Sequence, residues 1–492
     1  MLNFSPSNNV LPITKTYSPQ KSSWCFYLVT FFLATLPSLH SLSFIASWYN
    51  EKRLAQITIF LLLTASLLTS KKLQISTANY WGSLLPSQKI LISIFFICGL
   101  TSATQTNLTN WATMEIANYF LLALLSLYLA YSIYTESTDK LIIIALCTSA
   151  SLYVVAFAST LLAGLISDVI DYHYLLSGFI NRRFLNQFQS ISFPILLVAP
   201  LIFNKNLSIK LGLILIAAFW FMLMLVSDGR GVLLASTSGI ILSSLLLPAN
   251  RKRWLLTSGV VIALGSLMYF VFDAILSTHE VIDSSTLRPG TGGRLPIWLE
   301  VIDVIRDNPL LGIGPMQLAF SPSDFTVAHP HNITLQLAAE WGIPAAICLI
   351  VLSLNGFLHW IKQQRQLKQS NESLISIALT SSFIASVIHG HLSGVFVMPL
   401  SQLSFAVIAG WMLAKYRVGQ SNNKVNLAPR KCSLYIFPLL TMLALIMLIQ
   451  GSYPQIKAMI TSDYPENLYL NGEYPASNAP RFWSRTYIEA DN

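Results

Sequence analysis

The sequence predicts an all-α polytopic membrane protein with about twelve to thirteen transmembrane helices and one large loop on the outward side of the membrane. Hydrophobic residues make up 54% of the 492 residues, and charged residues only 10%. A soluble domain carries about 25% charged residues, so this composition indicates helices that lie in lipid. Apolar runs of roughly 20 residues, the length that crosses a bilayer, recur along the whole chain.

The expected membrane spans follow one another with short polar connections, except before the span that begins near residue 333. They are residues 24–46, 54–70, 88–104, 116–135, 140–166, 188–204, 209–226, 231–247, 254–274, 333–360, 373–394, 398–416 and 434–451. A merge among the short spans between 188 and 247 would change the count and reverse the orientation of everything before it. We expect one transmembrane domain over residues 1–451 and a C-terminal tail over residues 452–492.

Lysine and arginine residues predict the orientation, because loops that stay in the cytoplasm retain positive charge. With a cytoplasmic N-terminus, most of them fall on the cytoplasmic side and most acidic residues on the outward side. Residues 167–187, the loop 275–332 and the tail 452–492 are then outward. The net charge of +9 therefore reflects topology, and no basic stripe with interleaved aromatic residues indicates nucleic-acid binding.

The outward loop is expected to contain a short amphipathic helix that begins near Arg294. Ile297, Val301 and Ile305 recur at helical spacing behind the glycine-rich run 290–293. Free backbone N–H groups at the helix start, together with Arg294, would form an anion cradle. A flexible loop joined to an amphipathic helix is the alternative interpretation.

Arginines recur at other outward positions. Arg230 lies between two spans, where a charge at membrane depth costs a few kcal/mol and is usually paired or faces a polar cavity. A tight turn with a contact between Asp228 and Arg230 is the alternative. Arg182 and Arg183 precede another span and would either be surface charges or add to an outward cationic cluster.

A polar doublet, His331-Asn332, runs directly into an apolar helix. The positive end of the helix dipole favours a neutral imidazole at His331, which suits a base. Asn332, Gln336 and Glu340 fall at helical spacing, and such a polar stripe in lipid usually faces an interior cavity. Alternatively, Asn332 caps the helix and His331 hydrogen-bonds a loop carbonyl.

Two histidine pairs, His329 with His331 and His389 with His391, also lie on the outward side. Their spacing does not match a zinc pattern, and no His-Glu-x-x-His helix occurs. The chain has no Walker loop and no dinucleotide fingerprint. We therefore predict neither a metal nor a cofactor, and an activated substrate would have to arrive already energised.

Four motifs occur together: Gly229-Arg230-Gly231, Gly292-Gly293-Arg294 with Trp298 downstream, Asn308-Pro309-Leu310-Leu311-Gly312-Ile313-Gly314, and His331-Asn332 followed by Gly342. On these motifs, residues 180–415 resemble the O-antigen ligase and O-antigen polymerase superfamily of bacterial inner-membrane glycosyltransferases, which includes O-linked protein oligosaccharyltransferases. The family often has Ser-Arg-Gly where this chain has Asp228-Gly229-Arg230-Gly231. It also often has Gly, Thr or Tyr at the position of Ala345, a departure that weakens the similarity to the protein-glycosylating branch.

The resemblance implies a GT-C-like multi-pass enzyme of the bacterial inner (cytoplasmic) membrane, surrounded by membrane lipids. The catalytic loop 275–332 and the C-terminal tail would be periplasmic, and the N-terminus cytoplasmic. Family members take a glycan from undecaprenyl diphosphate and pass it to an acceptor hydroxyl without nucleotide or metal. The acceptor is the lipid A core in one branch and a periplasmic protein in another.

The same resemblance implies roles for residues of this chain. Arg230 and Arg294 would bind the departing diphosphate, because arginine offers permanently charged bidentate donors. His331 is the expected general base for the attacking hydroxyl. The other expected substrate-binding residues are Arg182, Arg183, Gly293, Trp298, Asn332, Gln336 and Glu340. We expect inversion at the anomeric carbon in a single displacement.

The leading functional prediction is a metal-independent ligase that joins O-antigen to the lipid A core. An O-antigen polymerase and an O-linked protein (pilin) oligosaccharyltransferase share its donor and chemistry and stay open. A polysaccharide exporter or flippase is the prediction from another class, but a carrier would hold its charges near the midplane between broken helices. The aromatic tail would either contact the acceptor or pack as a cap over the loop.

Overall fold

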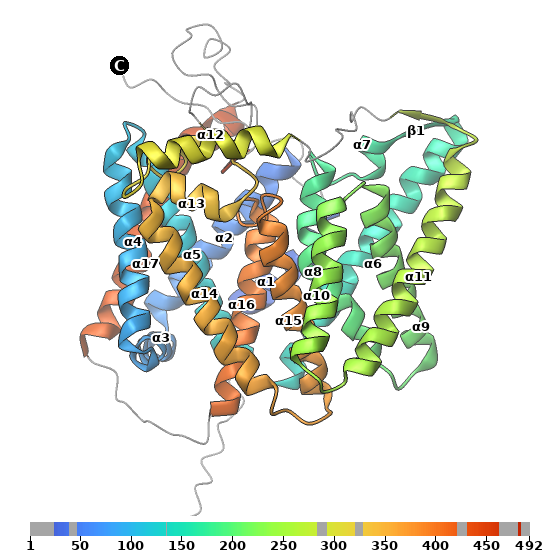
Figure 1. Cartoon of the computed structure of the whole chain (residues 1–492), viewed down its shortest axis with the longest axis horizontal. Helices are drawn as coiled ribbons and strands as arrows, with labels where there is room; N and C mark the ends of the chain where they lie inside the picture. The colour runs from blue at the N-terminus through green and yellow to red at the C-terminus, as the bar shows by residue number, and fades with distance from the viewer. Residues whose placement is uncertain are drawn as a thin grey trace, which may run out of the picture.

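The computed structural model describes residues 24–38, 47–133, 135–282, 293–319, 328–420, 431–461 and 481–483. The chain is an all-α multi-pass membrane protein, which confirms the predicted fold class (Figure 1). Ten helices in these ranges are long and apolar enough to cross a membrane: α2 (Trp48–Thr69), α4 (Pro86–Ser102, extended by a 3-10 turn), α5 (Thr109–Ser132), α6 (Glu136–Ser167), α8 (Arg182–Ile202), α9 (Leu207–Val226), α11 (Arg251–Leu276), α14 (Ile343–Gln364), α15 (Asn371–Gly390) and α17 (Lys431–Thr461). The remaining predicted spans contain α1 (Trp24–Thr35), α10 (Arg230–Leu246) and α16 (Pro399–Gln420).

The predicted span 333–360 is not one helix but two. Helix α13 (Ile333–Trp341) ends at Gly342, and α14 begins at the next residue. Gly342 has φ +87°, and a Cβ atom there would clash with the carbonyl oxygen of Leu310. Pro344 stands in the first turn of α14, where its missing N–H costs nothing. Glycine conformation and a close backbone approach therefore break the helix.

The Asn308–Gly314 run supplies the backbone that approaches this break. The N–H groups of Ile313 and Gly314 donate to the carbonyl oxygens of Ala339 and Glu340 at 2.9 and 3.1 Å. The N–H of Ile343 donates in return to the carbonyl oxygen of Pro309 at 2.9 Å. The run thus satisfies carbonyl groups at the end of α13, which would otherwise lack partners.

The helices that bear the outward loops lie at one end of the molecule, here called the α12 end. Helix α12 (Arg294–Asp307) crosses this end above α13, and the short helix α7 (Tyr172–Leu175) lies at the same end (Figure 1). Strands β1 (Val169–Asp171) and β2 (Glu280–Ile282) pair in parallel there. The two outward regions before α8 and after α11 therefore meet, as far as they are described.

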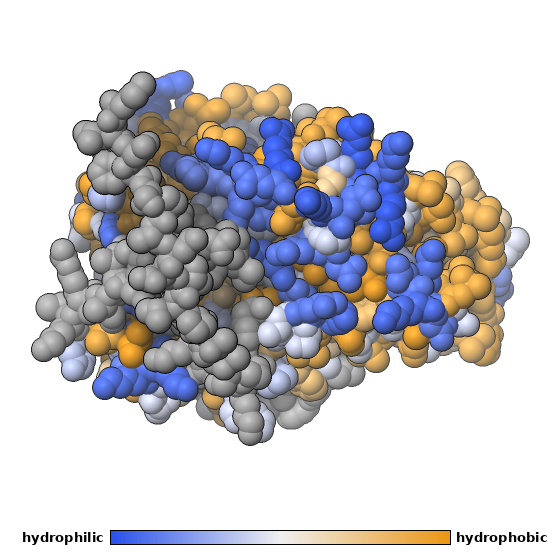
Figure 2. Space-filling view, turned by 90° about the horizontal axis from the view of Figure 1, so that it is seen from below, coloured by the Kyte–Doolittle hydropathy of each residue, from blue (hydrophilic) through white to orange (hydrophobic). Residues whose placement is uncertain are grey.

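The opposite end carries α3 (Lys71–Ser83), a helix that no predicted span covers (Figure 1). Figure 2 views this end and shows hydrophilic residues over much of it, with hydrophobic residues gathered along its edges. Several basic residues are exposed at the starts of α3 and α11: Lys71, Lys72, Arg251, Lys252 and Arg253. The sequence assigns these residues to the cytoplasmic side, and the side of the membrane that each end faces stays a prediction.

The centre of the bundle is formed by α8, α15 and α5. All residues in the most apolar window of α8 are buried, compared with 22% of that window in α11 and in α14. Helix α12 confirms the short helix predicted near Arg294. Its apolar residues Ile297 and Val301 pack against Ala339 of α13 and Leu318 of the 3-10 turn Gln317–Ala319. The amphipathic helix therefore lies directly over the segment that begins with His331.

Candidate active site

Residues 329–331, here called the histidine turn, precede α13 and have an uncommon backbone conformation. His331 has φ +55°, a region that a histidine visits more often than most residues but that still marks local constraint. Its N–H donates to Nδ1 of His329 at 3.2 Å, and the two imidazole rings meet edge to face with centroids 4.3 Å apart. Since Nδ1 of His329 accepts this bond, that ring carries its proton on Nε2 when neutral.

Helix α12 holds the histidine turn from above. The indole Nε1 of Trp298 donates to the carbonyl oxygen of Pro330 at 2.8 Å. Trp298 lies in the second turn of α12, whose buried face packs on α13. The aromatic residue predicted to bind substrate therefore also fixes the residue next to His331.

Asn332 caps α13, which is the alternative interpretation that the sequence offered for this residue. Its Oδ1 accepts from the N–H groups of Thr334 and Leu335 at 3.1 and 3.2 Å. Thr334 then bonds through Oγ1 to Nε2 of His391 at 3.0 Å. Nδ1 of His391 faces the carbonyl oxygen of Val387 at 2.8 Å and must donate to it, so Nε2 accepts from the threonine hydroxyl. The start of α13 is thereby tied to the end of α15.

Two arginines act on His331. Burial, with the positive charges of Arg294 and Arg183, lowers the pKa of His331 to about 3. Burial and the charge of Arg183 likewise lower the pKa of Arg294, which is the first residue of α12 behind Gly293 at φ +78°. Arg182 starts α8 beside Arg183, at the same end. The structure thus brings Arg183, Arg294 and a neutral His331 into one electrostatic cluster.

Arg230 lies in an exposed turn at the α12 end. Its side chain is 64% exposed, and its Nε stands 3.9 Å from Oδ1 of Asp228, whose φ is +50°. Asp228 and Arg230 therefore do form the contact that the sequence offered as an alternative interpretation, although the distance is long. A Cβ atom at Gly229 would come within 2.5 Å of the amide nitrogen of Asn186, which explains the glycine before Arg230.

His389 lies against the other glycine of this turn. A Cβ atom at Gly231 would stand 3.4 Å from its ring. Ser190 donates its hydroxyl proton to the carbonyl oxygen of Gln187 at 2.8 Å, and so accepts from Nδ1 of His389 at 3.0 Å. Nε2 of His389 is then unprotonated and lies on the side of Gly231. The sequence suggested this histidine only as a metal ligand, and no motif pointed to its place behind Arg230.

Gln336 and Glu340 face a buried arginine from the C-terminal tail. Nη2 of Arg481 donates to Oε2 of Glu340 at 2.6 Å and to Oε1 of Glu115 at 2.8 Å. Gln336 accepts from the same guanidinium at 2.6 and 3.1 Å when its amide oxygen is turned toward it. The polar stripe of α13 does face the protein interior, where its two inner members bind Arg481. Glu115, in α5, was not anticipated from the sequence.

The histidines of the two pairs have partners other than a metal. In the part of the chain that the structure describes, no three His, Cys, Asp or Glu side chains gather closely enough to hold a metal ion. His389 bonds to Ser190, and His391 to Thr334. Metal independence stays a prediction from the spacing of the histidines in the sequence.

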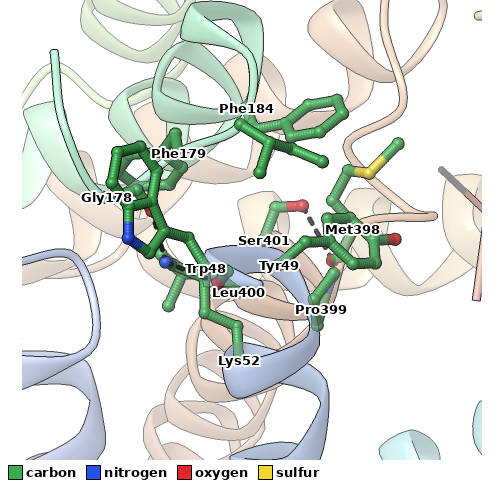
Figure 3. Close-up of a pocket in the computed structure, with 11 residues that line it drawn as sticks. Trp48, Tyr49, Lys52, Gly178, Phe179, Phe184, Met398, Pro399, Leu400 and Ser401 are labelled. Atoms are coloured by element: carbon green, nitrogen blue, oxygen red, sulfur yellow. Dashed lines mark hydrogen bonds between the residues drawn. The ribbon is translucent and has the colours of Figure 1, made fainter. Parts of the chain in front are cut away.

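A small pocket lies near the C-terminal segment, between the start of α2, the segment before α8 and the start of α16 (Figure 3). Lys52 projects along its wall but donates to the carbonyl oxygens of Gly178 and Trp48 at 2.5 and 3.0 Å. Its ammonium also stands 4.7 Å from the ring centroid of Phe179. The ammonium group of Lys52 is therefore bound by other parts of the protein, and the pocket adds no charged group to the site.

The fold and this site define a multi-pass membrane enzyme that brings arginines and a neutral histidine together at one end of a helical bundle. Residues 211–350 match the family model described as O-antigen ligase, which supports the resemblance to the O-antigen ligase superfamily predicted from the motifs. The matched range contains Arg230, Arg294 and His331. The chain matches no curated protein.

Proposed function

We propose that this protein transfers a glycan from undecaprenyl diphosphate to an acceptor hydroxyl on the periplasmic face of the inner membrane. Ligation of O-antigen to the lipid A core oligosaccharide is the leading form of this activity. The observation that carries the proposal is the cluster of Arg183, Arg294 and neutral His331 inside the range that matches the O-antigen ligase family. In this cluster His331 can accept a proton, and Arg183 and Arg294 can bind an anion.

The reaction follows from these groups. The acceptor oxygen attacks the anomeric carbon of the donor sugar while His331 takes the hydroxyl proton. The bond from the anomeric carbon to the phosphate oxygen breaks, and the diphosphate leaves with the electron pair. Arg294 binds the departing anion through two parallel N–H donors, with the charge of Arg183 beside it. A single displacement of this kind inverts the configuration at the anomeric carbon.

The electrostatics couple donor binding to the activation of the base. In the empty site, two positive charges and burial lower the pKa of His331 to about 3, so the ring is neutral but a weak base. A diphosphate between the arginines offsets their charge, and an anion near an imidazole raises its pKa. The ring therefore becomes a better proton acceptor only when the donor is in place. Arg230 reaches solvent at the same end and is assigned to the outer part of the diphosphate.

The orientation is also part of the proposal. The end opposite α12 carries exposed lysines and arginines and is assigned to the cytoplasm. The α12 end is then periplasmic, where undecaprenyl-linked glycans are used by this family. A carrier that exports or flips the glycan is less well supported, because its charged residues would lie near the midplane rather than on connections at one end.

Transfer by the purified protein in detergent tests the activity directly. The protein is incubated with undecaprenyl-diphosphate glycan and lipid A core, in excess chelator. We expect glycan on the lipid A core with the wild type, and a loss of about 10²–10⁴-fold in His331→Ala. His359→Ala is the matched control, since His359 is exposed on α14 and should leave transfer unchanged.

Three outcomes of this assay would redirect the proposal. Longer lipid-linked glycan without a modified core indicates a polymerase. In a parallel incubation with a pilin as the acceptor, modification of the pilin without modification of the core indicates the protein-glycosylating branch. A wild-type protein that leaves both donor and every acceptor unchanged contradicts the transferase, and the carrier then becomes the better assignment.

A further inference from the structure

We propose that Arg481, from the C-terminal segment, is a positioning residue for His331. It binds both flanks of the histidine turn and fastens them to α5. The structural part of this inference stands on contacts alone. Its catalytic consequence rests on the proposed function, in which His331 accepts the proton of the attacking hydroxyl.

The guanidinium of Arg481 is enclosed by acceptors. Its side chain is 1% exposed, although the residue follows the last membrane helix by sequence. Nη2 meets Glu115 at 2.8 and 3.2 Å and Glu340 at 2.6 Å. Nη1 donates to the carbonyl oxygen of Ala328 at 3.1 Å. An arginine with several charge-assisted bonds of this length holds its partners in a defined geometry.

These contacts bracket His331 along the chain. Ala328 immediately precedes the histidine turn, and Gln336 and Glu340 follow it on the inner face of α13. Trp298 binds the middle of the turn through the carbonyl oxygen of Pro330. Three anchors therefore act on residues 328–340, a segment that includes His331 with its positive φ. Arg481 supplies two of the three.

The segment that carries Arg481 is itself built into the bundle. The hydroxyl of Tyr49 donates to the carbonyl oxygen of Arg481, and Nε of Arg53 donates to that of Phe482 at 2.8 Å. The guanidinium of Arg53 also stacks 4.1 Å from the ring centroid of Phe482, and Trp483 is fully buried. Helix α2 thus holds residues 481–483 in place through Tyr49 and Arg53.

The charge balance explains why arginine is required. One positive charge stands between two buried carboxyl groups, one on α5 and one on α13. Removal of the guanidinium leaves these carboxyl groups facing each other without a counter-charge, which is strongly unfavourable inside a protein. Lysine keeps the charge but is a point donor and cannot bind both carboxyl groups and the Ala328 carbonyl in one plane.

The test separates position from stability with Arg481→Lys in the full chain. Backbone amide exchange over residues 328–341 and steady-state transfer are measured on the same detergent-purified protein. We expect faster exchange in this segment and a kcat that falls about 10- to 100-fold, the cost of a small misplacement of a catalytic group. The KM for the lipid-linked donor should stay within about twofold, because Arg294 and Arg183 are untouched. Arg306→Lys is the control, since Arg306 is exposed and pairs only with Asp303 in the same helix.

A merely structural role predicts a different result: less folded protein, with kcat per folded molecule and exchange in 328–341 unchanged. That result overturns the proposal. Glu115→Gln provides a second variant that retains Arg481 and Glu340 and tests the anchor from the α5 side, should Arg481→Lys fail to fold. The exchange measurement does not depend on transfer, so a failure of the proposed function, seen as full activity in His331→Ala, is distinguishable from a failure of this inference.

Discussion

The indole N–H of Trp298 donates to the carbonyl oxygen of Pro330, and this single bond joins the surface helix α12 to the histidine turn. Arg294 begins the same helix, one turn before Trp298. Displacement of α12 would therefore move Arg294, the proposed anion-binding residue, and His331, the proposed base, together. The amphipathic helix and the turn behave as one unit at the α12 end.

Trp298→Phe removes the donor and keeps an aromatic ring. We expect kcat for glycan transfer to fall about tenfold or more, because His331 loses one of its anchors. The free energy of unfolding should fall by only about 1 kcal/mol, the usual net contribution of one hydrogen bond. Trp24→Phe, at an exposed position of α1, is the control. A variant with wild-type kcat would show that the bond does not matter for the turn.

Arg294→Lys retains the positive charge at the start of α12. Transfer should nevertheless drop by most of its rate, since an ammonium cannot reproduce two parallel donors to a diphosphate. Arg306→Lys, in the last turn of the same helix, should have no effect because its partner is the exposed Asp303. Initial rates at saturating acceptor decide the matter, and near-normal transfer would remove Arg294 from the site.

The pH dependence of kcat/KM reports the substrate-free site. Since the pKa of His331 is lowered to about 3, the ring stays unprotonated as the pH falls from 8 to about 5, and its protonation should cause no loss of rate there. In Arg294→Gln one positive neighbour is gone, so the pKa rises and an acid limb enters at higher pH. Arg306→Gln should keep the wild-type profile. A fall in the kcat/KM of the wild type centred near pH 6.5 would contradict the lowered pKa of His331.

Gly342→Ala should destabilise the protein. The residue has φ +87°, and the new Cβ would clash with the Leu310 carbonyl, so strain of roughly 1–3 kcal/mol or more is expected. Gly356→Ala, in the interior of α14 with no heavy atom within 4 Å of its Cβ position, should be neutral or slightly stabilising. Thermal unfolding of the two variants in the same detergent gives the comparison. Equal midpoints would mean that the break between α13 and α14 relaxes at no cost.

Local patterns in the sequence predicted the helices well. The start of α12 at Arg294 follows from a glycine-rich run and from apolar residues at helical spacing. The break at Gly342 was missed because the hydrophobic residues continue through it. A signal existed, since glycine followed two residues later by proline is typical of a helix that stops and restarts. What enforces the break is a set of backbone bonds from residues 309–314, and such long-range bonds leave no periodicity in the sequence.

The candidate site also has parts that local sequence motifs predicted and parts that they did not. The motifs around Arg230, Arg294 and His331 are local, and the structure places all three at the α12 end, although their catalytic roles stay predictions. The inward face of Gln336 and Glu340 was predicted from their spacing, but the partner was not. Arg481 follows Glu340 by 141 residues, and only the three-dimensional fold brings them together. Helix α3 was missed because a short polar helix at a membrane surface lacks the apolar run that marks a span.

The order in which the chain is synthesised gives the Arg481 contact another consequence. Glu115 precedes Arg481 by 366 residues, so α5 enters the membrane long before its counter-charge is translated. The tail must then cross to the α12 end after α17 has been inserted. A nascent chain that stops short of residue 481 has every membrane helix that the structure describes but lacks the guanidinium that fastens the histidine turn. The turn is therefore completed only after α17 has been translated and inserted.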